Sequence, residues 1–418
     1  MVAITTAADR DAAFMCGLYR MLRLVTRPLL IIFLTIFVNL VGFGIIIPLL
    51  PFYAETFGAS PLVIGLLFAV FSLCQLLAAP ALGDLSDRYG RRPILIFSLA
   101  GTVVSFVMLA VAHSIVMLFA ARIVDGLSGG NISTARAYVA DITEPKDRAR
   151  AYGIIGAAFG LGFILGPALS GVLSGISYTA PIWAAAGITL VATVMAWLWL
   201  PETVHRTRAG TGNPFSYLPG LLQRPAVRRI LTIDFFYWLA FAMFQTTFSL
   251  FVARRFGFGV SKTGYFFAAF GLLGAAIQGG LIRPVVKRLG DKPTFLMGLG
   301  FGALGLVSAA SAHSVTLFAL ALVPLALGMG FGHPTMSSLV SLVARGDEQG
   351  RVQGAASAVE SLGRTIGPVW GNASLQHYGE STPYISAAAF LLLTLLLSVR
   401  FHVSATETAS AQPLPNRR

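Results

Sequence analysis

The feature that most constrains this chain is a series of twelve apolar runs separated by short segments that contain charge, Pro or Gly. Each run reaches about 20 residues, the length at which a helix spans about 30 Å of hydrocarbon. Backbone groups in lipid must be satisfied internally, which favours helices. The predicted spans are, in chain order, 28–53, 61–82, 93–112, 114–139, 150–174, 178–200, 228–251, 262–282, 293–312, 314–340, 351–375 and 383–399.

The composition agrees with an all-α integral membrane protein. Of 418 residues, 56% are hydrophobic and 11% charged, against roughly 45–50% and 25% in an ordinary soluble domain. The net charge of +13 lies mostly in the tails and in alternate loops, which predicts cytoplasmic termini and argues against a nucleic-acid partner. The two cysteines, Cys16 and Cys74, lie in a tail and in a span, so we expect no disulfide framework.

Residues 83–93, GDLSDRYGRRP, form a charged segment between the second and third spans. Its charges cannot lie in hydrocarbon, and its arginines predict a cytoplasmic turn. Three of its residues recur 200 positions later, which indicates a duplicated chain. The recurring pairs are Arg88 and Arg288, Gly90 and Gly290, and Pro93 and Pro293.

The duplication predicts twelve transmembrane helices in two pseudo-symmetric six-helix bundles. Such parallel repeats commonly place a substrate site near the bilayer midplane, where the halves meet. The predicted boundaries are an N-terminal tail at 1–27, a first bundle at 28–200, a linker at 201–227, a second bundle at 228–400 and a C-terminal tail at 401–418. The linker is rich in Pro and Gly and is expected to be cytoplasmic, with a short interfacial helix around residues 218–222.

Polar residues inside the spans are the candidate functional residues. Placing a polar or ionisable side chain in the membrane interior costs free energy, so such residues usually have a function. The third, sixth, ninth and twelfth spans contain no charge, Asn, Gln or His, so these are expected to face lipid. Spans one, four, seven and ten are expected to line a cavity. The candidates for substrate contact or proton coupling are Asn39, Arg122, Asp125, Asp234, Gln245, His333, Glu360 and Arg364.

Two pairs among these candidates share a helix face. Arg122 and Asp125 are three residues apart and form either a structural pair or a proton relay. Glu360 and Arg364 are four apart, for which a structural ion pair is the leading interpretation and proton coupling the second. His333, before Pro334, fits proton sensing and hydrogen-bonded packing equally well.

Aromatic residues crowd the seventh span. About half of them are expected to face the cavity, where broad rings suit a flat hydrophobic drug, and lipid anchoring accounts for others. They are Phe235, Phe236, Tyr237, Trp238, Phe241, Phe244 and Phe248.

Four motifs together resemble the major facilitator superfamily, in its drug:proton antiporter branch, close to the tetracycline-efflux proteins. They are the segment at 83–93, Arg122 with the Asp125-Gly126 pair, the fifth-span glycine run that ends at Gly166-Pro167, and the first-span segment at 42–51. The resemblance implies export of a small, tetracycline-like compound in exchange for protons by alternating access. Transport of an endogenous metabolite is the alternative.

The resemblance also implies two roles for groups of residues. The charged segment would be a cytoplasmic conformational latch, with a solvated topology-setting turn as the alternative; its parts are Gly83, Asp84, Asp87, Arg88, Gly90, Arg91 and Arg92. The fifth-span glycines would mark an antiporter, with ordinary helix packing as the alternative. These are Gly156, Gly160, Gly162, Gly166 and Pro167.

The chain departs from the resemblance at two positions. Asn39 and Gln245 stand where related tetracycline-efflux proteins commonly carry an acid, and neither amide can titrate. If protons drive transport, Asp125, Asp234 or Glu360 must carry them, and Asp125 is the leading candidate.

Other classes of protein are disfavoured. A Walker loop is absent from the sequence, so ATP is not expected to drive transport. A membrane enzyme would need clustered acids or histidines, and a receptor remains a third possibility. We expect no cofactor and no metal, a small-molecule substrate with protons as partners, and a monomer in the plasma or inner membrane.

Overall fold

The computed structural model describes residues 27–129, 131–144, 148–203, 218–344 and 348–400, and every regular element in these ranges is a helix. The elements before the linker are α2 (Arg27–Glu55), α3 (Pro61–Tyr89), α4 (Arg91–Ala110), α5 (Ile115–Ser128), α6 (Asn131–Ile142), α7 (Arg148–Leu173) and α8 (Ala180–Trp199). Those after it are α9 (Leu218–Leu222), α10 (Pro225–Phe256), α11 (Val260–Ala276), η1 (Ile277–Leu281), α12 (Ile282–Leu289), α13 (Asp291–Ala310), α14 (Val315–Leu342), α15 (Gln349–Tyr378) and α16 (Thr382–Val399).

The predicted all-α membrane fold is confirmed. Within the described ranges, ten helices are long and apolar enough to cross a membrane, and they match ten of the predicted spans. The other two predicted spans correspond to α5 with α6 and to α15, a 30-residue helix that carries Glu360 and Arg364 in its middle. The helix predicted around residues 218–222 is α9, while both tails and most of the linker lie outside the described residues.

The charged segment at 83–93, which we expected to be a turn between two helices, is mostly helical. The helix α3 continues through it to Tyr89, so that only Gly90 separates α3 from α4. Its 29 residues measure about 43 Å at 1.5 Å per residue, longer than the hydrocarbon, and the charged end can therefore stay helical in water. Gly90 has a φ of 110°, a backbone conformation that favours glycine. Gly290 repeats this break between α12 and α13, with a φ of 85°.

The predicted fourth span is also wrong as a single helix, because it divides into α5 and α6. The first piece ends at Ser128, where the Gly129 N–H donates to the Gly126 carbonyl at 3.1 Å, and α6 begins at Asn131. Glycine is a poor helix former. A glycine-rich stretch at the centre of the span therefore interrupts the helix close to the functional site.

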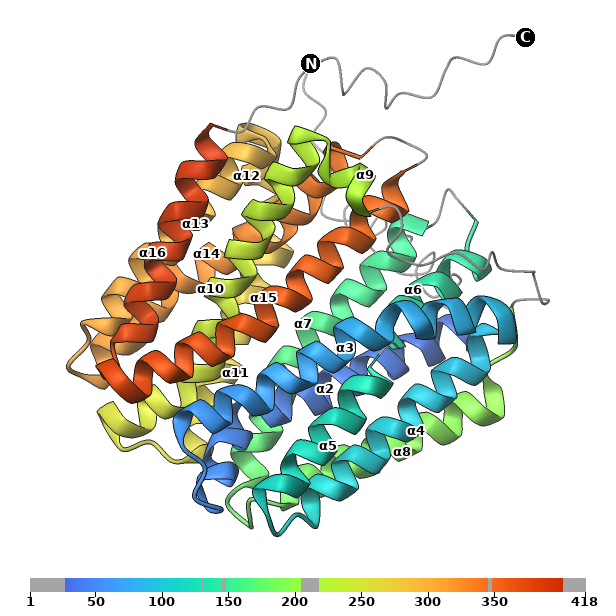
Figure 1. Cartoon of the computed structure of the whole chain (residues 1–418), viewed down its shortest axis with the longest axis horizontal. Coiled ribbons are helices and arrows are strands. Elements are labelled where there is room, and N and C mark those ends of the chain that lie inside the picture. Colours follow the sequence, from blue (N-terminus) through green and yellow to red (C-terminus); the bar gives the residue numbers. More distant parts are fainter. Residues whose placement is uncertain (1–26, 130, 145–147, 204–217, 345–347, 401–418) are drawn as a thin grey trace, which may run out of the picture.

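The helices before the linker lie on one side of the molecule and those after it on the other (Figure 1). Contacts between the two halves pair α3 with α15 and α7 with α11. At one end of the helices, which we call the far end, the Leu62 N–H donates to Gln376 Oε1 at 3.1 Å and the Ser261 hydroxyl donates to the Gly171 carbonyl at 2.7 Å. The opposite end carries residues 83–93, and we call it the latch end.

Glycine allows the halves to approach closely at the far end. A Cβ atom added to Gly264 of α11 would lie 2.7 Å from backbone atoms of Gly171 of α7. A Cβ atom on Gly65 of α3 would lie 2.5 Å from the Pro368 carbonyl oxygen of α15. Small residues permit such backbone contact between membrane helices, and here they close the far end between the halves.

Candidate functional site

A cavity of about 240 Å³ lies between the two halves. The predicted lining spans one, four, seven and ten all contribute to it, through α2, α5, α10 and α14. Residues of α3, α4, α7, α11, η1 and α15 also line it. The third span was predicted to face lipid because it contains no charge, Asn, Gln or His. In the structure, Thr102 and Phe106 of α4 line the cavity. That criterion missed them because it does not count hydroxyl groups or aromatic rings.

Five of the eight candidate residues line the cavity, namely Asn39, Asp125, Gln245, His333 and Arg364. The other three, Arg122, Asp234 and Glu360, are not part of its lining. Two further amides, Gln75 and Gln278, line it as well. The walls therefore combine several neutral amides with two charged groups.

Arg122 and Asp125 form a buried ion pair at the wall of the first half. The distance from Arg122 Nη2 to Asp125 Oδ2 is 2.5 Å, and Arg122 is 1% exposed. The guanidinium also lies over the ring of Phe71, 5.1 Å from its centroid. Asp125 lines the cavity while Arg122 lies behind it, so a proton or a substrate would reach the acid first.

The second half holds a different charged cluster around Trp238. The guanidinium carbon of Arg364 lies 5.2 Å from the centre of the Trp238 ring, and His333 meets the same ring edge-on at 5.3 Å. The Asp234 side chain is buried, and its Oδ2 atom has no hydrogen-bond partner in the described part of the chain.

The ion pair predicted between Glu360 and Arg364 does not form in this structure. Among the described residues, no Glu360 oxygen lies within 4.0 Å of an Arg364 nitrogen. The guanidinium lies over the indole of Trp238 instead, where the ring face attracts a cation. The helical spacing correctly predicted that Glu360 and Arg364 lie on the same face of α15. The contact with the Trp238 ring of α10 explains why the arginine side chain does not turn toward Glu360.

Aromatic rings form much of the cavity wall. Of the seven aromatic residues in the seventh span, Tyr237, Trp238, Phe241 and Phe244 line it. Phe248 does not face lipid; it is fully buried, with its ring centre 4.2 Å from that of Phe267. Rings from other helices that sequence analysis did not single out also line the cavity, and these are Phe43, Phe71, Phe106, Phe159, Phe163, Phe267 and Phe270.

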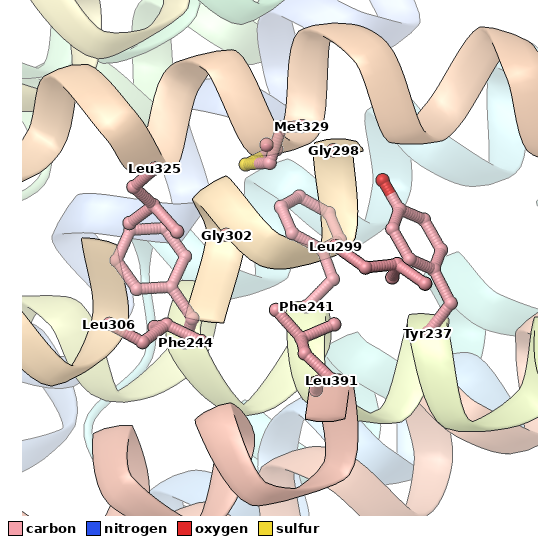
Figure 2. A pocket seen from close by; sticks show the side chains of 12 residues that line it. Tyr237, Phe241, Phe244, Gly298, Leu299, Gly302, Leu306, Leu325, Met329 and Leu391 are labelled. Atoms are coloured by element: carbon pink, nitrogen blue, oxygen red, sulfur yellow. The ribbon is translucent and has the colours of Figure 1, made fainter. Parts of the chain in front are cut away.

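Three of the cavity-lining rings of α10 also border a second, smaller space inside the second half. Tyr237, Phe241 and Phe244 line an apolar pocket of about 20 Å³ with residues of α13, α14 and α16, among them Leu299 and Leu391 (Figure 2). The rings of α10 therefore separate the large cavity from this pocket. A space of that size holds about one water molecule, so the large cavity is the candidate substrate site.

Charged residues of the latch segment form a network within the first half. Arg88 pairs with Asp84 at 2.8 Å, and Arg91 pairs with Asp87. Arg91 Nε also lies 3.3 Å from Asp141 Oδ2 at the end of α6. These contacts join α3, α4 and α6.

Glu202, just after α8, completes this network. Its carboxylate accepts hydrogen bonds from the backbone N–H groups of Arg91 at 2.9 Å and Arg92 at 3.3 Å. These amides lie at the start of α4, where a carboxylate satisfies unpaired donors and the helix dipole. Asp141 and Glu202 were not among the candidates predicted from the sequence, where they are two acids in predicted loops that are otherwise basic.

We expect Glu202→Ala to destabilise the protein by about 0.5–2 kcal/mol, the usual effect of removing a side chain that accepts hydrogen bonds from the first N–H groups of a helix. Glu202→Gln should cost less, because its amide oxygen still accepts a hydrogen bond. Thermal unfolding of the purified variants measures both changes. An unfolding midpoint for Glu202→Ala equal to that of the unmodified protein would show that Glu202 does not hold α4.

The glycines of the fifth span serve two surfaces. A Cβ atom on Gly166 would lie 2.7 Å from Gly44 Cα, and one on Gly162 would lie 2.5 Å from Leu40 Cβ, so these two glycines allow α7 to contact α2 closely. Gly160 and Pro167 line the cavity. Among the described residues, a Cβ atom on Gly156 would have nothing within 4 Å.

Comparison with known proteins gives matches over most of the chain. The family model of the Major Facilitator Superfamily matches residues 32–368 and 279–417. The chain is 33% identical over 350 residues to the tetracycline resistance protein, class C, of Escherichia coli, a match that covers 82% of this chain and 88% of that protein. It is 34% identical over 348 residues to the class G protein of Vibrio anguillarum, covering 81% and 88%. The crystal structure of the human organic anion transporter MFSD10 superposes with a TM-score of 0.70 at 26% identity, covering 89% of this chain and 99% of that one.

Proposed function

Since the chain belongs to the Major Facilitator Superfamily, we propose that it is a secondary active transporter that exports a flat, amphipathic, drug-like compound in exchange for protons. One observation carries the proposal: a cavity lined by aromatic rings and amides lies between the halves. Pockets with mostly apolar walls and a few placed polar groups bind small molecules of this kind. The tetracycline resistance proteins among its relatives make tetracycline the first compound to test.

Alternating access follows from where the halves touch. Contacts such as Leu62 with Gln376 and Ser261 with Gly171 hold the far end closed. We place the latch end, with the linker and both tails, in the cytoplasm, since Lys and Arg favour that side. The cavity then takes its substrate from the cytoplasmic side. Release outside requires these contacts to break and the latch end to close. We propose that the transporter works as a monomer.

The transport test uses the purified full-length protein in liposomes that contain tetracycline on one side. An imposed pH gradient should drive tetracycline against its concentration gradient, and a protonophore should stop this movement. Movement of tetracycline only down its gradient, at every pH difference, would support a facilitator and contradict proton exchange. The same assay separates a transporter from an enzyme or a receptor.

The orientation is tested by cysteine labelling in a variant with Cys16 and Cys74 replaced by Ser. We expect Thr56→Cys, at the far end, to react with a membrane-impermeant maleimide in spheroplasts. Gln223→Cys, near the end of the linker, should react only after the membrane is opened. Both positions are exposed. Labelling of Gln223→Cys from outside would reverse the proposed orientation.

A further inference from the structure

Arg364 is a cavity-lining arginine that makes no hydrogen bond or ion pair with the described residues. It lies in the middle of α15 and lines the cavity. In the described part of the chain, its Nε has no hydrogen-bond partner, and no carboxylate oxygen lies within 4.0 Å of its nitrogens. A guanidinium has five N–H donors and no acceptor. The Nε of Arg364 is buried, so the donors open to a group that enters the cavity are those of the two Nη atoms.

The other charged group on the wall is already compensated. Asp125 is paired with Arg122 at 2.5 Å, so this part of the wall carries little net charge. Asp234 and Glu360 interact electrostatically with Arg364, but neither lines the cavity or forms an ion pair with it. These two acids reduce the cost of keeping Arg364 in the membrane interior and leave its hydrogen-bonding positions free.

Neutral groups supply the rest of the polar lining. The amides Asn39, Gln75, Gln245 and Gln278 line the cavity and carry no charge that would attract a cation. Trp238 also lines the cavity, and the Arg364 guanidinium lies over its ring at 5.2 Å. A positive charge therefore lies beside a flat aromatic surface in one wall.

We propose that the transported compound carries an anionic oxygen group, such as a carboxylate or an enolate, which Arg364 binds while the compound's ring system packs against the aromatic wall around Trp238. Arginine suits this role because its planar fork can donate two parallel hydrogen bonds to an anion. The proposal rests on the proposed transport function and adds to it the charge of the substrate and the residue that selects for it.

The test is equilibrium binding of two dyes with the same ring system to the purified full-length protein. Fluorescein is anionic and rhodamine 123 is cationic. We expect fluorescein to bind at least about tenfold more tightly, the ratio that corresponds to one hydrogen-bonded charge of about 1.4 kcal/mol. Arg364→Gln should abolish the preference. Arg364→Lys should retain part of it, because lysine keeps the charge and loses the fork.

Equal binding of both dyes to the unmodified protein, or tighter binding of rhodamine 123, would overturn the proposal. Unchanged fluorescein binding by Arg364→Gln would do the same. Gln245→Ala is the matched control: it changes a neutral lining group and should affect both dyes alike. If Arg364→Gln does not fold, judged by its thermal unfolding, the dye preference of the unmodified protein and of Arg364→Lys decides the question.

The binding test needs no gradient, so its outcome is separate from that of the transport function. A charge preference without pH-driven tetracycline export would support the anion site and contradict proton exchange. Proton-driven export without any charge preference would support the transport function and remove Arg364 as the selecting residue.

Discussion

Replacement of Asp125 by Asn should abolish pH-driven export and leave downhill exchange of substrate. Asp125 is the carboxylate that both lines the cavity and contacts a buried arginine, with Arg122 Nη2 at 2.5 Å. Antiport needs a group whose protonation changes with the state of the transporter, and Asn cannot titrate. The measurement is counterflow of labelled tetracycline in liposomes, compared with accumulation under an imposed pH gradient.

The buried pair also complicates this variant, because removal of one partner leaves Arg122 uncompensated, at a cost of about 3–5 kcal/mol. The matched control is Asp125→Asn combined with Arg122→Gln, which restores neutrality without restoring a titratable group. Both variants should fail to accumulate tetracycline, and the double variant should be the more stable. Full pH-driven export by either one would remove Asp125 from the mechanism and point to Asp234 or Glu360.

Replacement of Asp87 by Asn should reduce transport at least about tenfold while expression and membrane insertion stay near normal. In this structure Asp87 pairs with Arg91 inside the first half, and its side chain is 47% exposed. The helices α3 and α15 pack against each other, and the end of α3 and the start of α15 lie at the latch end. We infer that closing the latch end brings Asp87 to the N-terminus of α15, where a partly buried carboxylate is stabilised by up to about 2 kcal/mol. A loss of about 1.4 kcal/mol corresponds to a tenfold change.

The matched control is Asp291→Asn, which makes the same change at the repeat of the latch segment in the second half. Asp291 begins α13, directly after Gly290, and among the described residues it forms no ion pair like that of Asp87 with Arg91. Initial rates of tetracycline export, normalised to protein in the membrane, measure both variants. Equal rates for Asp87→Asn and the unmodified protein would leave residues 83–93 as a topology signal only.

The sequence alone predicted the membrane class, the order of the spans and the duplication. The physical reason is that hydrocarbon constrains sequence strongly: spans must be apolar and about 20 residues long, and charges such as those of residues 83–93 must leave the membrane. The same constraint made the intramembrane candidates visible, because a polar residue such as Asp125 or Arg364 stands out in an apolar run. Five of these eight candidates line the cavity.

Only the tertiary structure decided which partner each of these groups has. Spacing along one helix cannot fix how neighbouring helices are rotated or which ring crosses in front of a charge. Arg364 therefore lies over Trp238 and not against Glu360, and Glu202 reaches α4 from more than a hundred residues away. The same holds for the backbone at Gly90 and in the middle of the fourth span. Glycine can adopt several backbone conformations, and the packing around it determines which one is present.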